Sequence, residues 1–529
     1  MTAPEPSLRR REFLGALGVG GAAIAGSGLV AACGSSSSGT TTASSAGGPK
    51  RGGTLNAGLS GGSSSDSLNA LTPVQSTDFA RTMCLFEPLT VFGPTGPVEN
   101  VLASEVTPNK DATTWTIRLR SGITWHNGKP LTADDIIYTL QVITNPKNPM
   151  PGATALTLVD VKGLKKLDSL TVSVPCSRPF SVLPQALAAW YLNVVPVGYD
   201  PKHPPQHPVG TGPFKYKSFS PGVQSVFPRN ENYWRSGLPY IDSLVITDYS
   251  DETAQVNALI SGSVDVIDLL SAASIAPVQS AGKKTVVSNT SAFTPIYMDR
   301  SKAPFNDVRV SQAMRLCCNR PQMMNEIFGG HGNLGNDIYA LASPDYDHSI
   351  PQRHQDIEQA KSLLKQAGQE HLTVTLTTAP IAQGTVEMAT LFAQDASLAG
   401  VTVNLDKTTP AVEFGPGYPN FLFAQDYVIY TGYIMQVAFT NVPGAPYYET
   451  HFHDPKYVSL YNEALSTVDD TKRYEIEHEM MQIDWQSGGQ IIPYFYPTID
   501  GYSPKVGGVR TSVTGWPLAG FDFKSMWIS

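Results

Sequence analysis

Positive charge and cysteine are both scarce in this chain. Its 529 residues include 37 Lys and Arg against 45 Asp and Glu, and charged residues make up only 16% of the total. Nucleic-acid-binding proteins usually gather Lys and Arg on one face, so this balance argues against a nucleic-acid partner. The five cysteines include no C-x-x-C spacing, which argues against a zinc or redox site. Cys317 and Cys318 are adjacent in an expected helix, and we interpret them as buried fillers rather than a disulfide.

Long apolar runs are also missing after the first 33 residues. A membrane-spanning helix needs about 18 or more consecutive apolar residues, and the later sequence offers no such run. Hydrophobic residues still make up 41% of the chain, which is enough to bury more than one core. We therefore expect several globular lobes rather than one.

The N-terminus has the layout of an export signal. Three arginines at positions 9–11 precede Phe13, Leu14 and an apolar run rich in Gly and Ala. Paired arginines followed by Phe and Leu are typical of a twin-arginine signal, and the Sec route is the alternative. The run ends in Val-Ala-Ala-Cys at 30–33, which resembles a lipobox. We expect residues 1–33 to be a lipoprotein signal peptide and lipid on Cys33 to hold the protein at the outer face of the cell membrane, in the periplasmic space.

Residues 34–50 are dominated by Ser, Thr and Gly. A polar segment of this kind cannot bury enough apolar surface to fold, so we expect a flexible linker between the lipid anchor and the folded part.

From residue 51 onward, strand-like and helix-like patterns alternate, which predicts an α/β fold. Residues 115–120 alternate apolar and polar side chains, as a half-buried strand does. Thr132 and Asp135 have the spacing of a capping box for a helix that runs toward Ile143. Apolar periodicity predicts further helices over 356–367 and 385–399, and the second of these leads into a strand at 401–405.

Several segments resemble the family-5 extracellular solute-binding proteins, the peptide- and nickel-binding lipoproteins of ABC transporters. The clearest is WTIRLRSGITWHNGKPLTADDI at 115–136. Four further matches follow the family order: RGGTL at 51–55, VGTGPF at 209–214, NENYW at 230–234 and PFNDVRVSQA at 304–313.

The resemblance implies a periplasmic-binding-protein-like fold of the class II type, in which two α/β lobes joined by a hinge enclose the ligand and an extra lobe is inserted. Lobe I would comprise residues 51–90, 203–291 and 490–529, the inserted lobe II residues 91–202, and lobe III residues 292–489. The implied function is capture of a peptide or peptide-like solute and its delivery to ABC permease subunits, by a monomer without a cofactor or catalysis. Open alternatives are an oligosaccharide or a nickel chelate as the ligand, a sensory lipoprotein without transport, and an exported serine hydrolase.

The hydrolase alternative depends on Ser60, which lies in a G-x-S-x-G match at 58–62. The match borders a Ser/Gly-rich run, where it arises easily from composition, so we place Ser60 in a loop at the pocket mouth instead. His478 and Glu479 begin an H-E-x-x-H-like pattern, but Gln482 replaces its second histidine. The segment 451–454, His-Phe-His-Asp, carries metal-ligand types but is more typical of a surface turn, and no metal site is predicted.

The ligand itself is suggested by a departure from the family. Dipeptide-binding members hold the ligand's amino terminus with an aspartate in a G-W-x-x-D-Y-P-D-P-like segment. The corresponding residues 430–439 of this chain, YTGYIMQVAF, contain no carboxylate, and residues 378–384 lack the arginine that would hold the ligand carboxylate. We therefore expect an aromatic, neutral pocket and a neutral or blocked ligand; the alternative is that Tyr433 and Phe439 are ordinary core residues. The predicted ligand-binding residues are Ser60, Thr431, Gly432, Tyr433, Met435, Gln436 and Phe439.

Overall fold

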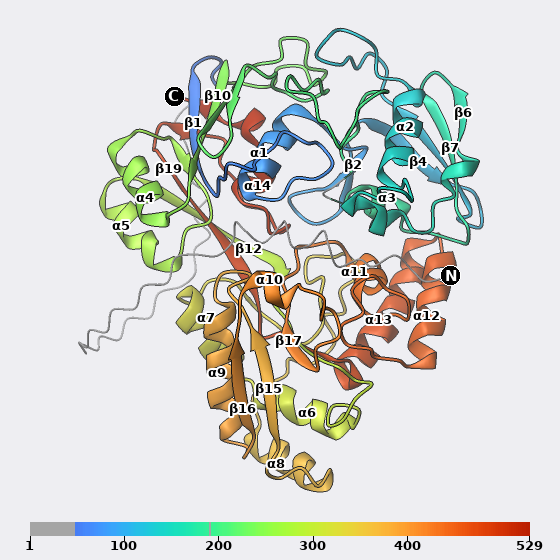
Figure 1. Cartoon of the computed structure of the whole chain (residues 1–529), viewed down its shortest axis with the longest axis vertical. Coiled ribbons are helices and arrows are strands. Elements are labelled where there is room, and N and C mark those ends of the chain that lie inside the picture. The colour runs from blue at the N-terminus through green and yellow to red at the C-terminus, as the bar shows by residue number, and fades with distance from the viewer. Residues whose placement is uncertain (1–47, 190–191) are drawn as a thin grey trace.

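The computed structural model describes residues 48–189 and 192–529. The expected signal peptide, Cys33 and most of the expected linker lie outside these residues. The described chain is built around three larger sheets (Figure 1).

The largest sheet has eight strands and lies at the top of Figure 1, toward the left. Its centre is β1, which pairs in parallel with β10 and β11 and buries Leu55, Ala57 and Leu59 completely. These three residues are at alternate positions and therefore share one face of the sheet. In spatial order the strands are β12 (Lys284–Phe293), β19 (Tyr494–Tyr502), β11 (Val266–Ile267), β1 (Thr54–Ser60), β10 (Ser243–Tyr249), β9 (Gln224–Pro228) and β8 (Ser218–Ser220), and β14 (Asn333–Leu334) also pairs with β19.

Helices and a small two-stranded sheet accompany this large sheet. The helices α1 and α4 both contact β1, and α5 contacts β12. Their bounds are α1 (Ser76–Leu85), α4 (Glu252–Ser261), α5 (Ile275–Ser280) and α14 (Leu518–Phe521), and the small sheet pairs β20 (Val506–Gly507) with β21 (Trp527–Ile528).

The second sheet has four strands and lies at the upper right of Figure 1. In β5, Trp115, Ile117 and Leu119 are buried while Arg118 is exposed, so the predicted half-buried strand is confirmed. The capping box is also confirmed, because Asp135 Oδ2 accepts a hydrogen bond from the Thr132 amide at 2.9 Å at the start of α2. The order is β4 (Ala103–Pro108), β5 (Thr114–Leu119), β7 (Thr171–Pro175) and β6 (Lys165–Asp168), with α2 (Ala133–Ile143), α3 (Leu183–Leu187) and a hairpin of β2 (Thr90–Phe92) and β3 (Val98–Asn100) nearby.

The third sheet has five strands and forms the lower part of the molecule. The helices predicted over 356–367 and 385–399 are confirmed as α8 and α9, and the strand that follows as β16, with ends that differ by one or two residues. The order is β16 (Thr402–Lys407), β15 (Thr373–Thr378), β17 (Phe423–Gln425), β13 (Ile296–Met298) and β18 (Gln490–Ile491). The helices are α6 (Val308–Cys317), α7 (Arg320–Phe328), α8 (Ile357–Gln366), α9 (Thr385–Ser397), α10 (Pro410–Glu413), α11 (Tyr433–Thr440), α12 (Pro455–Ser466) and α13 (Asp470–Ser487).

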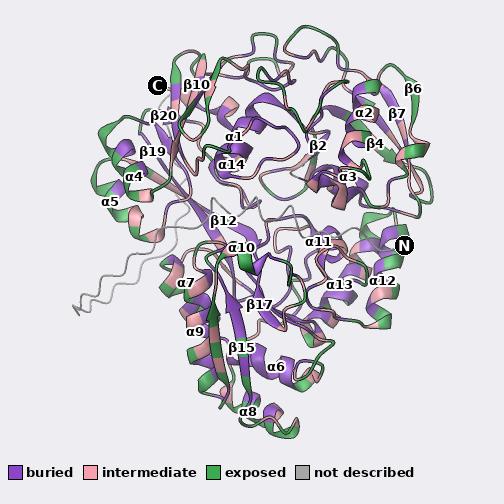
Figure 2. Ribbon diagram, in the orientation of Figure 1, coloured by how far each residue is buried: buried purple, intermediate pink, exposed green. Residues whose placement is uncertain are grey.

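Two short connections join the large upper sheet to the lower one. β12 ends at Phe293 and β13 begins at Ile296, while β18 ends at Ile491 and β19 begins at Tyr494. Figure 2 shows most of β19 and the C-terminal part of β12 as buried, and the outer faces of α4 and α8 as exposed. The resulting arrangement is α/β throughout, as predicted, with lobes joined by crossing strands. The residues at which lobes I, II and III divide stay a prediction.

Cys317 ends α6 and Cys318 follows it, and both thiols are free and buried. Burial raises the pKa of each thiol to about 12, so neither is a reactive thiolate at neutral pH. Their interpretation as buried fillers is confirmed. Among the described helices, none combines the length and the apolar character needed to span a membrane.

Candidate functional site: two cavities between the lobes

Two cavities lie where the lobes meet. The larger has a volume of about 390 Å³. It lies between the β2–β3 hairpin and the four-stranded lobe on one side and α11 and α13 on the other. The smaller, of about 190 Å³, lies between residues 83–101, residues 429–431 and the C-terminal segment 510–524. Both therefore take their walls from segments far apart in the sequence.

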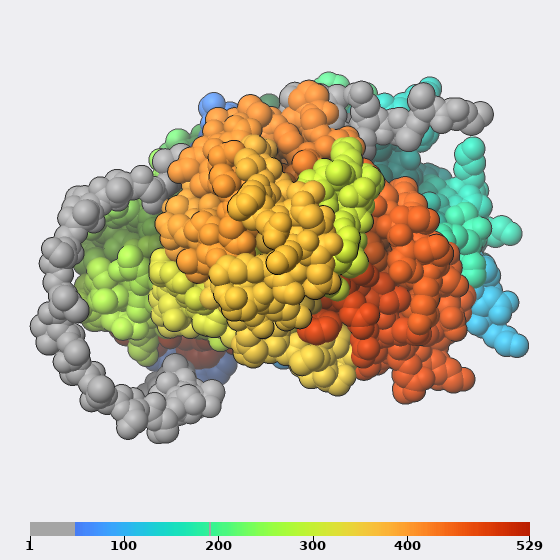
Figure 3. All heavy atoms as spheres, turned by 90° about the horizontal axis from the view of Figure 1, so that it is seen from below, coloured from blue at the N-terminus to red at the C-terminus, as the bar shows by residue number. Residues whose placement is uncertain are grey.

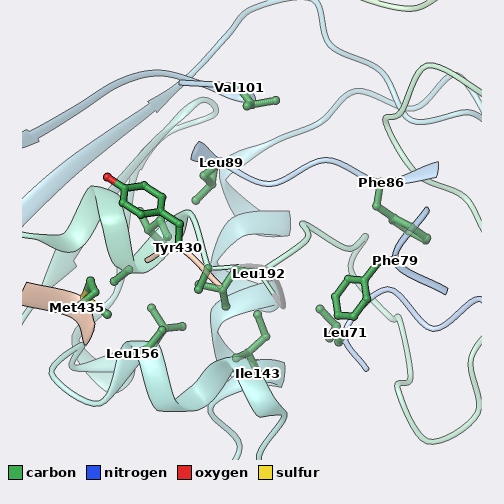
Figure 4. Packing of buried hydrophobic residues seen from close by; sticks show 14 of the residues in the cluster. Leu71, Phe79, Phe86, Leu89, Val101, Ile143, Leu156, Leu192, Tyr430 and Met435 are labelled. Atoms are coloured by element: carbon green, nitrogen blue, oxygen red, sulfur yellow. The ribbon is translucent and has the colours of Figure 1, made fainter. Parts of the chain in front are cut away.

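Phe92 and Tyr430 line both cavities and form the partition between them. Their ring centroids are 5.0 Å apart and the rings meet edge to face at 71°, a favourable aromatic geometry. Figure 4 shows Tyr430 and Met435 in one apolar cluster with Leu89, Leu156 and Leu192. The partition is thus continuous with the apolar core.

The β2–β3 hairpin approaches the opposite wall very closely at Gly96. A Cβ atom on this residue would lie 2.3 Å from the Ala342 carbonyl oxygen, and its φ of 112° favours glycine. The Val513 amide also donates a hydrogen bond to the Pro94 carbonyl at 2.9 Å. The hairpin therefore contacts two other walls directly.

One wall of the larger cavity carries charge. Asp345 and Glu477 are 4% and 2% exposed, and Asp470 lies beside them. Arg473 Nε lies 3.2 Å from Glu477 Oε1, and Arg473 Nη2 lies 2.6 Å from Asp470 Oδ1. Burial, followed by the neighbouring Asp345 carboxylate, raises the pKa of Glu477 well above its ordinary value.

The smaller cavity also has charged walls, and two of its carboxyl groups have several hydrogen-bonding or charged partners. Glu87 accepts hydrogen bonds from Tyr233 at 2.6 Å, Trp234 at 2.8 Å and Thr211 at 3.1 Å. Burial nevertheless raises the pKa of Glu87 above its ordinary value. At the opposite end, Asp522 pairs with Lys524 and, at 2.5 Å, with Arg510.

A buried polar network supports the start of α11 beneath the larger cavity. Asp484 accepts hydrogen bonds from Tyr433 and Tyr457, each at 2.8 Å, and from Asn441 at 2.7 Å. The Tyr433 ring stacks on Tyr339 with centroids 5.0 Å apart. Burial raises the pKa of Asp484 to about 6, although its three donors favour the charged form.

The predicted ligand residues of segment 430–439 divide between the two cavities. Gly432, Tyr433 and Met435 line the larger cavity, and Thr431 lines the smaller. Gln436 lies behind the wall, where its amide oxygen accepts a hydrogen bond from Thr431 at 3.1 Å. Phe439 packs, half-buried, against the core and lines neither cavity.

Ser60 lies away from both cavities, as the last residue of β1. Its amide donates a hydrogen bond to Asp268 Oδ1 at 2.7 Å. The next α-helix begins only at Ser76, whereas a hydrolase nucleophile sits on a sharp turn directly before a helix. Ser60 therefore belongs to a strand and not to the expected loop, and its contact with the ligand stays a prediction.

The segment 451–454 does not assemble a metal site. Asp454 caps α12 by accepting hydrogen bonds from the Lys456 and Tyr457 amides, and His451 Nδ1 lies 3.3 Å from Asp299 Oδ1. No group of three metal-ligating side chains occurs within residues 48–189 and 192–529.

Sequence reasoning missed the charged wall, so the expectation of a neutral pocket needs correction. Segment 430–439 indeed carries no carboxylate, but Asp345 and α13 supply carboxylates to the same cavity. These residues are distant from the segment in sequence, and only the fold brings them together.

Comparisons with known proteins agree with this architecture. Residues 97–453 match the family "Bacterial extracellular solute-binding proteins, family 5 Middle". The periplasmic oligopeptide-binding protein OppA of Salmonella typhimurium is 25% identical over 449 residues, which cover 76% of this chain and 80% of OppA. The nickel-binding periplasmic protein of Escherichia coli is 26% identical over 299 residues, covering 55% of this chain and 56% of that protein. The chain thus spans only about half the length of some curated relatives.

Among solved structures, the binding protein AgaA of A. tumefaciens R10, in complex with agropinic acid, superposes with a TM-score of 0.76 at 22% identity, covering 90% of this chain and 99% of AgaA. At this identity the likeness establishes the fold, and the predicted periplasmic-binding-protein architecture is confirmed. With the family match covering most of the chain, this protein belongs to the family-5 bacterial extracellular solute-binding proteins.

Proposed function

We propose that this protein captures a peptide or peptide-like solute between its lobes and delivers it to the permease of an ABC importer. The observation that carries the proposal is the pair of cavities enclosed between lobes that are joined by crossing strands. Such connections permit the hinge closure by which a binding protein surrounds its solute. No covalent step is needed, so the protein acts as a binder and not as an enzyme.

The relatives favour a peptide as the first candidate, because OppA binds oligopeptides according to its name. A nickel chelate or an oligosaccharide in the same cavities is the alternative. The protein would work as a monomer at the outer face of the membrane, held by lipid on Cys33, with the permease as its partner.

Native mass spectrometry of the mature protein purified from its own cells tests the proposal directly. We expect a bound solute that is lost on denaturation. When that solute is returned to stripped protein, small-angle scattering should report a smaller radius of gyration, because closure brings the lobes together. Identical scattering profiles at saturating solute would contradict closure.

The variant Ser60→Ala distinguishes solute binding from the hydrolase alternative. A binder keeps its affinity for the co-purified solute, because Ser60 lines neither cavity. Turnover of the solute by the unmodified protein that disappears in Ser60→Ala would instead support hydrolysis.

A further inference from the structure

The wall of the larger cavity has an excess of negative charge. Its charged side chains are three carboxyl groups, Asp345, Asp470 and Glu477, and one guanidinium group, Arg473. Arg473 contacts Glu477 and Asp470 and therefore leaves Asp345 without a cation. Ionisation of all three carboxyl groups would leave two negative charges uncompensated in this wall.

Asp345 is the group that requires a partner. It is 4% exposed, it lines the cavity, and its Oδ1 atom is buried without a hydrogen-bond donor among the described residues. A buried carboxylate oxygen without a donor is costly, so native proteins nearly always provide one. The Glu477 carboxyl can donate a hydrogen bond to Asp345 while it holds a proton, and a bound cation would take over that role.

Aromatic rings complete the same cavity. Trp115 and Tyr474 line it from opposite lobes, together with Phe92, Tyr430 and Tyr433. Ring faces attract cations, most strongly where water is excluded. At about 390 Å³ the cavity falls in the usual range for small-molecule sites. A small organic cation therefore fits both the charge and the walls better than a neutral or anionic group.

We propose that the larger cavity binds the ammonium or guanidinium group of an organic cation, with Asp345 as its counter-ion and Glu477 beside it. This inference rests on the proposed function and names the class of solute that the same interlobe site selects. The solute would be an amine or a guanidine, such as an arylalkylamine or a peptide with a basic side chain.

Binding should also displace a proton. Burial and the nearby Asp345 carboxylate raise the pKa of Glu477 well above its ordinary value, and a cation bound beside Glu477 would favour its charged form and release its proton. The groups that face this pair are Arg473, Asp470 and Tyr474 on α13 and Tyr430 before α11. Of these only Arg473 is cationic, and it is already engaged by Glu477 and Asp470. Affinity for the cation should therefore rise with pH.

Calorimetry on stripped mature protein, with tyramine and agmatine as cations and N-acetyltyramine as the neutral analogue of tyramine, tests the inference. We expect saturable binding of at least one cation and none of N-acetyltyramine. Titrations in two buffers that differ in ionisation enthalpy should show a proton released on binding. Equal affinity for tyramine and N-acetyltyramine, or binding of neither tyramine nor agmatine, would overturn the inference.

Variants locate the site. Asp345→Asn keeps the shape of the side chain and should weaken cation binding at least tenfold, and Glu477→Gln should abolish the proton release. Glu475→Gln removes one charge from the exposed face of α13 and should bind as the unmodified protein does. Should Asp345→Asn fail to fold, Glu477→Gln carries the test alone. Unchanged affinity in Asp345→Asn would refute the assignment.

The co-purified solute separates this inference from the proposed function. A solute without any amine or guanidinium group, which still compacts the protein, would refute the cation site and leave solute capture intact. A preparation that contains no solute and compacts with none of the three probes would count against both.

Discussion

Arg81 is fully buried among carboxylates of the largest sheet and its helix. Its guanidinium lies 3.0 Å from Asp66 and 3.7 Å from Asp78, and it also pairs with Asp248. Burial, and then the charge of Asp66, raises the pKa of Asp78 to about 7. One cation thus offsets several carboxyl groups in an interior where unpaired charges are costly.

The variant Arg81→Met should lower the free energy of unfolding by about 3–5 kcal/mol, because it leaves Asp66 and Asp248 buried without a cation. Urea unfolding followed by circular dichroism measures the change. Arg309→Met is the control, since Arg309 pairs with Asp307 at the surface, where water screens the ion pair and it contributes little to stability. Similar losses in the two variants would contradict this account.

Cys33 carries a separate prediction for a single residue. The variant Cys33→Ala cannot accept lipid, and we expect it to appear in the medium or the periplasm instead of the membrane fraction. Cell fractionation and immunoblotting measure the distribution, with Cys176→Ala as the control. Membrane association that persists in Cys33→Ala would show that another anchor holds the protein.

Residue pairs differ in how far the sequence predicts them. The capping pair of Thr132 and Asp135 is predictable because its partners lie three positions apart on one helical turn. Asp345 and Glu477 come from distant segments, and neither has a local pattern that reveals the other. The aromatic ring of Tyr433 is visible in the sequence, but its hydroxyl bond to Asp484 depends on how α11 packs on α13.

At the scale of elements, α12 of the lower lobe forms hydrogen bonds with the four-stranded lobe. The Ser181 amide donates a hydrogen bond to the Leu465 carbonyl, and the Ser181 hydroxyl one to the Ala464 carbonyl, both at 2.8 Å. Arg178 donates one to Asn462 at 2.6 Å. Figure 3 shows the red-orange surface of this region next to the teal lobe. These bonds must break when the two lobes separate.

The double variant Arg178→Ala and Ser181→Ala should therefore bind its solute more weakly. Two lost hydrogen bonds are worth about 2 kcal/mol, which corresponds to roughly thirtyfold in the dissociation constant. Calorimetry with the co-purified solute measures the change. Ser177→Ala is the control, because its hydroxyl bonds Leu158 within one lobe. Unchanged affinity in the double variant would mean that α12 does not limit closure.

Elements are predicted well where periodicity is strong and local. The strand at 115–120 and the helices α8 and α9 follow from alternation, apolar stripes and capping residues. The pairing of β14 with β19 could not be predicted in this way, because a two-residue strand has no periodicity. The order of strands in each sheet likewise depends on contacts between distant segments.

For the molecule as a whole, buried carboxyl groups make stability depend on pH. Burial raises the pKa of Asp268 to about 6, of Asp500 to about 8 and of Glu413 to about 9. A carboxyl group whose folded pKa exceeds its unfolded value binds more protons when folded. Its contribution is complete below the unfolded pKa and is lost as pH rises through the folded pKa.

We expect the melting temperature to be higher at pH 5 than at pH 9, since a tenfold difference in proton affinity between the folded and unfolded states corresponds to about 1.4 kcal/mol. One group opposes the trend between pH 5 and 7, because burial lowers the pKa of His126 to about 4, but the raised carboxyl groups outnumber it. Although burial opposes it, Arg320 and Arg353 hold the pKa of Asp337 below its usual range, so its contribution is already present at pH 5. Calorimetric scans at pH 5, 7 and 9 measure the effect. A melting temperature that rises steadily to pH 9 would contradict it.

The close approach of Gly96 to the Ala342 carbonyl has a consequence for affinity. An alanine at this position is strained by its positive φ in any arrangement, but it meets the Ala342 carbonyl only while the two walls are in contact, so Gly96→Ala should lower the fraction of molecules that are ready to hold solute. The apparent dissociation constant equals the intrinsic constant divided by that fraction, so a tenfold smaller fraction weakens binding of every solute tenfold. Position 96 therefore sets how tightly the protein binds, independently of which solutes it prefers.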